Sequence, residues 1–99
     1  MAQFDVHRVD ATGAFVIDCQ SDLLDDLNTR LVVPVVPRDA APAIAQQLNP
    51  VFAIAERDYV MVTQFAAAVQ RRELGSVVVS LKDRGFEVIC ALDVLTRGV

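Results

Sequence analysis

Residues 3–19 read QFDVHRVDATGAFVIDC, and this stretch decides the fold class. Polar and apolar residues alternate over residues 3–9, which is typical of a β-strand with one buried face. Residues 10–13 favour a turn, because the glycine accepts a positive φ and the aspartate can cap its own turn. Residues 15–19 then read as the returning strand. The chain is therefore expected to open with a β-hairpin.

The middle of the chain is rich in β-branched residues and prolines. Residues 21–28 are polar apart from three leucines and predict a loop or a single helical turn. Residues 30–36 predict a strand, and because proline cannot donate to a ladder, Pro34 and Pro37 place it near a sheet edge, bent or ended there. Residues 40–48 predict at most a marginal turn or two of helix.

A second hairpin is expected from residues 51–55 and 59–63, which flank a polar loop at residues 56–58. Helix and strand preferences conflict over residues 64–74, where we favour a strand. Residues 77–79 are all valine and predict a short strand after Gly75.

The end of the chain predicts an α-helix. Gly98 suits the position just after its last turn, because it accepts a left-handed conformation. An apolar face recurs at three- and four-residue spacing in Phe86, Val88, Ile89, Leu92 and Leu95, with Glu87, Asp93 and Arg97 on the other side. The expected fold is a single domain, residues 1–99, of the α+β class and mostly β.

Composition narrows the possible functions. The 99 residues are 54% hydrophobic and carry a net charge of −4. Arginine and lysine are scattered except for the pair at residues 71–72, so no basic stripe for direct nucleic-acid binding is expected. Neither of the long uncharged runs, residues 40–55 and residues 60–70, reaches the roughly 18–20 residues of a membrane helix, and no signal peptide is visible. We expect a cytoplasmic protein, and the high apolar share favours a homodimer.

The residues that usually carry catalysis or bind metals are sparse. His7 is the only histidine and is expected on the polar face of its strand. The acidic group at residues 22–26 lacks the spacing of a calcium loop and reads as solvated. Cys19 and Cys90 are expected to be separate free thiols. We therefore expect no catalytic residue, no metal site and no cofactor.

Two blocks carry a resemblance to a known family. Residues 15–25 read FVIDCQSDLLD and residues 30–34 read RLVVP, a combination similar to the pattern of the CcdB family. Further matches lie at the opening QFDV, in residues 50–63, and in the closing ALDVLTRGV at residues 91–99. The resemblance extends along nearly the whole chain.

This resemblance implies a homodimer built on an SH3-like small barrel or five-stranded antiparallel sheet with a C-terminal α-helix. It implies a toxin that binds the A subunit of DNA gyrase and stabilises the cleaved-DNA state, and that is not an enzyme. Its implied partner is a CcdA-type antitoxin whose disordered tail folds on the toxin.

The resemblance also implies which residues contact gyrase. The carried-over positions are Leu23, Leu24, Asp93, Thr96, Arg97, Gly98 and Val99, and the end of the helix is expected to lie beside the leucine pair so that they form one docking face. From the residues alone, the two leucines are as consistent with core packing as with an exposed contact. Arg97 is either one half of a surface ion pair with Asp93, four residues away, or an interface anchor.

One departure bears on the function. Some members of the family carry a tryptophan at the position of Arg97, and arginine cannot fill the same apolar pocket. An antitoxin-binding homologue that no longer poisons gyrase is therefore an alternative. A MazF-like ribonuclease, which shares the barrel architecture, is a third possibility, although fold analogy alone does not transfer activity.

Overall fold

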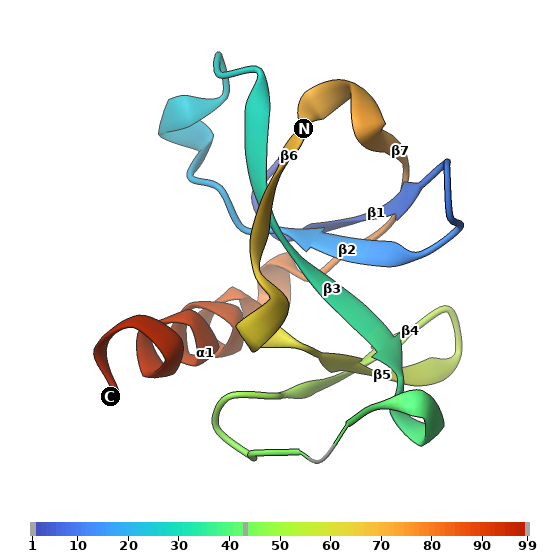
Figure 1. Ribbon diagram of the computed structural model, residues 1–99, viewed down its shortest axis with the longest axis vertical. Coiled ribbons are helices and arrows are strands. Elements are labelled where there is room, and N and C mark those ends of the chain that lie inside the picture. Colours follow the sequence, from blue (N-terminus) through green and yellow to red (C-terminus); the bar gives the residue numbers. More distant parts are fainter. Residues whose placement is uncertain (1, 43, 99) are drawn as a thin grey trace.

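The computed structural model describes residues 2–42 and 44–98, and over these residues it confirms an α+β fold that is mostly β. One antiparallel half-barrel sheet carries a single C-terminal α-helix (Figure 1). Its elements are β1 (Asp5–Val9), β2 (Phe15–Asp18), β3 (Thr29–Pro37), β4 (Val51–Ile54), β5 (Arg57–Met61), β6 (Ala67–Gln70), β7 (Leu74–Ser80) and α1 (Gly85–Arg97). The strand order is β4-β5-β3-β2-β1-β7, with β6 also paired to β3.

The third strand lies in the middle of the sheet, so the expectation of an edge strand is wrong. Strand β2 pairs along one side of β3, while the other side pairs first with β6, up to Val32, and then with β5, from Val35 (Figure 1). Pro34 lies where β3 changes partner, so its missing N–H leaves no gap in either ladder. Its carbonyl accepts a hydrogen bond from Val62 N at 2.9 Å. Within the described residues the sheet has seven strands, because β5 and β6 both pair with β3, whereas the resemblance implied a sheet of five strands.

Both expected hairpins are confirmed, with a shift in the second turn. The loop between β4 and β5 is Ala55-Glu56 instead of residues 56–58, and both residues have positive φ, 51° and 65°. Two positive φ values in a two-residue loop are the signature of a type I′ turn, whose twist matches that of the flanking strands. Neither alanine nor glutamate favours this conformation, so the turn is held by the ladder around it.

We expect Glu56→Gly to raise the free energy of unfolding by about 1 kcal/mol, because glycine adopts a positive φ without a Cβ clash. Urea denaturation measures the change. The matched control is Gly13→Ala, at φ 74° in the turn of the first hairpin, which is expected to change stability in the opposite direction. A Glu56→Gly protein less stable than the parent would contradict this account of the turn.

The remaining local expectations hold in part. Residues 22–24 form one 3-10 turn, as expected for this loop. Residues 64–74 contain β6 between two 3-10 turns, Thr63–Phe65 and Arg71–Glu73. Strand β7 is longer than expected and runs through Gly75. Ala40 ends a short 3-10 turn, Arg38–Ala40, and residues 41–42 and 44–48 contain no helix, only a turn at residues 46–48. No helix in the described parts of the chain has the length and apolar character needed to cross a bilayer.

The core lies on two faces of the sheet. Along β2 and β3, Ile17 and Val33 point to one face and Val16 and Val32 to the other, as strand alternation requires. The first face packs against α1 and the β4–β5 hairpin through Val6, Ile17, Val33, Val35, Phe52, Ile54, Met61, Leu81, Val88 and Ala91. The second, smaller cluster consists of Val16, Val32 and Leu74, with Val9 and Val69 packed against it.

Helix α1 buries only part of the apolar face that the sequence predicts, because Val88 is buried and Leu92 packs against the core, whereas Leu95 is exposed. Gly85, Val88 and Ala91 are buried, whereas Phe86 and Ile89 are exposed. The ring of Phe4 lies against Gly85 so closely that there is no room for a Cβ. This contact turns the small residues of the helix toward the sheet, because the helix can approach the Phe4 ring this closely only where its own side chains are small.

Candidate functional site

The loop between β2 and β3, residues 19–28, displays leucines to solvent. We call it the dileucine loop. Ser21 precedes a 3-10 turn at Asp22–Leu24, and its Oγ accepts a hydrogen bond from Leu23 N at 3.2 Å. Leu23 is 94% exposed, and Leu24 is half exposed. Core packing of this leucine pair is therefore excluded, and the expectation of an exposed apolar bump is the one that agrees with the structure.

A buried ion pair lies beneath this loop. Asp18 and Arg30 are both fully buried, on neighbouring strands. Arg30 Nε and Nη2 donate to Asp18 Oδ2 at 3.0 and 2.6 Å, and Asp18 Oδ1 accepts from Gln20 N at 3.1 Å. Both carboxylate oxygens thus have partners, which is the condition under which a buried charge is tolerated.

The ion pair extends upward into the dileucine loop. Arg30 Nη1 donates to Asp25 Oδ1 at 3.1 Å. Gln20 Nε2 donates to Leu24 O at 3.0 Å, while its Oε1 accepts from Leu31 N at 3.0 Å. The loop is therefore fastened to the sheet by polar contacts, since its leucines point away from the core.

The C-terminal end of α1 is the second candidate region. Thr96, Arg97 and Gly98 are exposed and Asp93 is half-buried. Gly98 has φ 77°, and its N donates to Val94 O at 3.0 Å, which confirms the expected left-handed helix end. Asp93 and Arg97, both described, form no ion pair with each other within 4 Å. Val99 lies outside the described residues.

The two candidate regions do not meet in one copy of the chain. Figure 1 shows the 3-10 turn of residues 22–24 at the upper left and the end of α1 at the lower left, where it projects clear of the sheet. The expectation that they lie beside each other as one face is not what the fold produces. They are two separate exposed regions on one side of the molecule.

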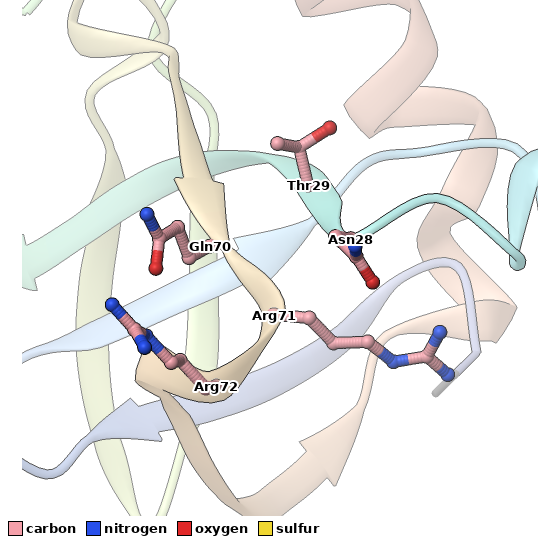
Figure 2. Close-up of a pocket in the computed structure, with 5 residues that line it drawn as sticks. All are labelled: Asn28, Thr29, Gln70, Arg71 and Arg72. Carbon is pink, nitrogen blue, oxygen red and sulfur yellow. The ribbon is translucent and has the colours of Figure 1, made fainter.

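A hollow of about 640 Å³ lies next to the dileucine loop, where β6 ends beside the start of β3 (Figure 2). Asn28, Thr29, Gln70, Arg71 and Arg72 line it. Figure 2 shows the two arginines pointing to opposite sides, with Arg72 on the side of Gln70. Arg71 reaches the dileucine loop, where its Nη1 donates to Asp25 O at 2.6 Å. Sequence reasoning missed this residue, because the contact spans 46 positions.

His7 is buried, contrary to the expectation of a polar surface face. It pairs with Val16 on β2, so its side chain lies on the face of the sheet that carries the second cluster, where it is buried. Its Nδ1 lies 3.0 Å from Gly75 O, and because a carbonyl only accepts, Nδ1 carries the proton. Nε2 has no partner among the described residues. A side chain in this position is not accessible to a substrate as an acid or a base.

Other potentially reactive groups are also constrained. Burial, with a smaller contribution from the charge of Asp18, raises the pKa of the Cys19 thiol to about 12. Cys19 and Cys90 are free thiols, as expected. Among the described residues no group of three His, Cys, Asp or Glu side chains gathers where it could hold a metal ion.

Comparison with protein families accounts for this arrangement. The family model described as CcdB protein matches residues 3–98. The match covers both hairpins, the dileucine loop and the whole C-terminal helix with its left-handed end. The chain therefore belongs to the CcdB family.

Proposed function

We propose that this chain is the toxin of a type II toxin–antitoxin system, which binds the A subunit of DNA gyrase and traps the complex that holds cleaved DNA. The family match over residues 3–98 carries the proposal. The residues of contact are Leu23 and Leu24 of the dileucine loop, together with Asp93, Thr96, Arg97, Gly98 and Val99. The protein acts as a poison of another enzyme and has no catalytic residue of its own.

The exposure of Leu23 supports this function. Almost all of its side chain faces water, so a folded monomer gains nothing from it, and an apolar anchor for a partner explains why it is there. One large partner can contact both exposed regions. A standard interface covers about 800 Å² per partner, which is a substantial part of the total accessible surface of 5905 Å² of this small chain.

Trapping requires unequal affinity for the states of the gyrase cycle. A ligand shifts an equilibrium only by the difference between its affinities for the two states. The toxin therefore has to bind the cleaved-DNA state more tightly than the resealed state. The remaining parts of the proposal are a homodimer, a CcdA-type antitoxin that folds on the toxin, a cytoplasmic location, and a role in plasmid maintenance and transcription regulation.

The direct test is a gyrase assay with the purified full-length protein. We expect cleaved plasmid to accumulate in the presence of ATP and protein, and the gyrase A subunit to be retained by the immobilised toxin. Removal of residues 97–99 is expected to abolish both effects. Absence of cleavage and of retention with the intact chain would end the proposal. A monomer by sedimentation at micromolar concentration would remove its dimeric part.

We expect Leu23→Ala to weaken binding to the gyrase A subunit by about 10- to 100-fold, as truncation of a central anchor does. The free energy of unfolding should stay within about 0.5 kcal/mol, because the side chain makes almost no contacts. Titration calorimetry and urea denaturation measure the two quantities. The matched control is Ile44→Ala, an exposed aliphatic residue in a different loop, which should change neither. Equal affinity of the two variants would remove Leu23 from the interface.

Arg97 favours a second candidate function, a homologue that still binds antitoxin and no longer poisons gyrase. Its side chain is exposed, and it stands where some family members have an apolar anchor. Growth arrest on expression in a gyrase-sensitive host, relieved by removing residues 97–99, supports the toxin. Antitoxin binding without growth arrest supports the second function.

A further inference from the structure

We propose that Arg71 is a positioning residue for the dileucine loop, which it holds in the shape that presents Leu23 to the partner. The proposal rests on the proposed function, because it takes the loop to be part of the gyrase contact. Arg71 lies outside the loop, in the 3-10 turn Arg71–Glu73 that follows β6. It acts through the loop and does not itself touch the partner.

Arg71 makes two contacts with the dileucine loop, both to Asp25. Its Nη1 donates to the backbone carbonyl of Asp25 at 2.6 Å, and its Nη2 lies 3.6 Å from Asp25 Oδ1. The same Oδ1 accepts from Arg30 Nη1 at 3.1 Å. Asp25 is thus held by two arginines from different parts of the fold. Charge-assisted contacts of this kind are stronger than neutral hydrogen bonds.

The loop needs these contacts because its apolar residues do not anchor it. Leu23 is almost fully exposed and Leu24 and Leu27 are about half exposed, so the leucines supply little of the packing that usually orders a loop. Apart from the two arginines, the hydrogen bonds that involve a side chain and join the loop to its surroundings lie mostly at its start: Gln3 Nε2 to Cys19 O at 3.1 Å, Gln3 N to Asp22 Oδ1 at 2.9 Å, Gln20 N to Asp18 Oδ1 at 3.1 Å and Leu31 N to Gln20 Oε1 at 3.0 Å. Within the loop, Gln20 Nε2 donates to Leu24 O at 3.0 Å. The shape of the loop therefore depends on its polar contacts.

The backbone around Arg71 brings the side chain to the loop. Arg71 N donates to Asn28 O at 2.7 Å, directly after the paired stretch of β6 and β3. A capping box between Gln70 and Glu73, in which Gln70 N donates to Glu73 Oε2 at 2.7 Å, closes the turn. The base of the Arg71 side chain is thus fixed beside the last residues of the loop.

A loop held in its bound shape binds more tightly than a mobile one. Ordering a loop on binding costs free energy, and a loop already ordered in the free protein avoids that cost. Loss of the Arg71 contacts is expected to leave the fold intact and to loosen residues 21–28. Affinity for the partner should fall only to the extent that Leu23 contributes to it.

Arg72 provides a matched control next in the sequence. It carries the same charge and lines the same hollow, but Figure 2 shows it pointing away from Arg71. Within the described chain its side chain forms no hydrogen bond and no ion pair. Replacing either arginine by methionine removes one positive charge, so a difference between the two variants measures the contacts and not the net charge.

The experiment compares the full-length parent with Arg71→Met, Arg72→Met, Leu23→Ala and the double variant Arg71→Met/Leu23→Ala. Hydrogen exchange is followed at the amides of Leu24, Asp25 and Leu27, which are hydrogen-bonded within the loop. Binding to the purified gyrase A subunit is measured by calorimetry. In Arg71→Met we expect loop exchange to rise about tenfold and affinity to fall about five- to tenfold. Arg72→Met should match the parent.

When Leu23 is already replaced by alanine, Arg71→Met should cause little further loss of affinity. The double variant should therefore bind about as weakly as Leu23→Ala alone, because the two residues act through one contact. Three results would overturn the positioning role: loop exchange in Arg71→Met equal to that in Arg72→Met, faster exchange that extends to the amides of β3, or full affinity for gyrase despite a loosened loop. If the parent itself does not bind gyrase, the proposed function fails, and the exchange data still decide whether Arg71 orders the loop.

Discussion

Arg30→Met is expected to lower the free energy of unfolding by about 3–5 kcal/mol, the cost of leaving a buried charge without its partner. Arg30 and Asp18 are both fully buried. Without the guanidinium, Asp18 keeps only the hydrogen bond from Gln20 N. Asp25 loses one of its two arginine contacts at the same time. Urea denaturation followed by circular dichroism measures the effect.

The control for this prediction is the double variant Asp18→Leu/Arg30→Met. Replacing a whole buried ion pair by apolar residues is often close to neutral, so the double variant should recover a large part of the lost stability. A double variant as unstable as Arg30→Met would mean that the loss comes from packing and not from the unpaired carboxylate. A single variant within about 1 kcal/mol of the parent would contradict the prediction itself.

Gly85→Ala is expected to lower the free energy of unfolding by about 1–3 kcal/mol through overpacking. Helix propensity alone predicts the opposite sign, because alanine is better than glycine in a helix by about 1 kcal/mol. The added Cβ would lie 2.5 Å from Phe4 Cε2 and within 3 Å of two further ring carbons. Thermal and urea unfolding both report the change.

The ring of Phe4 has little freedom to move aside. Phe4 has φ 74°, its N donates to Asp18 O at 2.6 Å, and its O accepts from Leu81 N at 2.8 Å. The control is therefore Phe4→Ala/Gly85→Ala compared with Phe4→Ala alone, a background in which alanine at position 85 should be neutral or stabilising. A Gly85→Ala protein more stable than the parent would show that the ring yields.

Local patterns were enough to predict most of the elements. The alternation in residues 3–9 and 15–19 and the spacing of the C-terminal helix each report one element, and each element formed. Only part of the expected helix face is buried, because the contact between Phe4 and Gly85 joins parts of the chain that are far apart. Hydrophobic size suggested Phe86 and Ile89 for the core, whereas close approach selected glycine and alanine.

The errors in the sheet have the same origin. Pro34 indicated an edge strand because a central strand was assumed to pair with a single neighbour on each side. On one side β3 instead pairs with two strands in succession, and Pro34 lies between them. His7 read as a surface residue because the sequence does not show that β7 returns to lie beside β1. The leucines of the candidate site could be identified from the family pattern, but Arg71 could not, since nothing near it in the sequence points to Asp25.

The pairing of β1 with β7 has a consequence for biosynthesis. Asp5 is paired with Ser80, and Val9 with Leu74, so one side of β1 has no neighbour until the ribosome has delivered residues 74–80. An unpaired strand side invites association with other chains. Nascent or prematurely ended chains of this protein should therefore self-associate or need a chaperone, and native folding should follow synthesis instead of accompanying it.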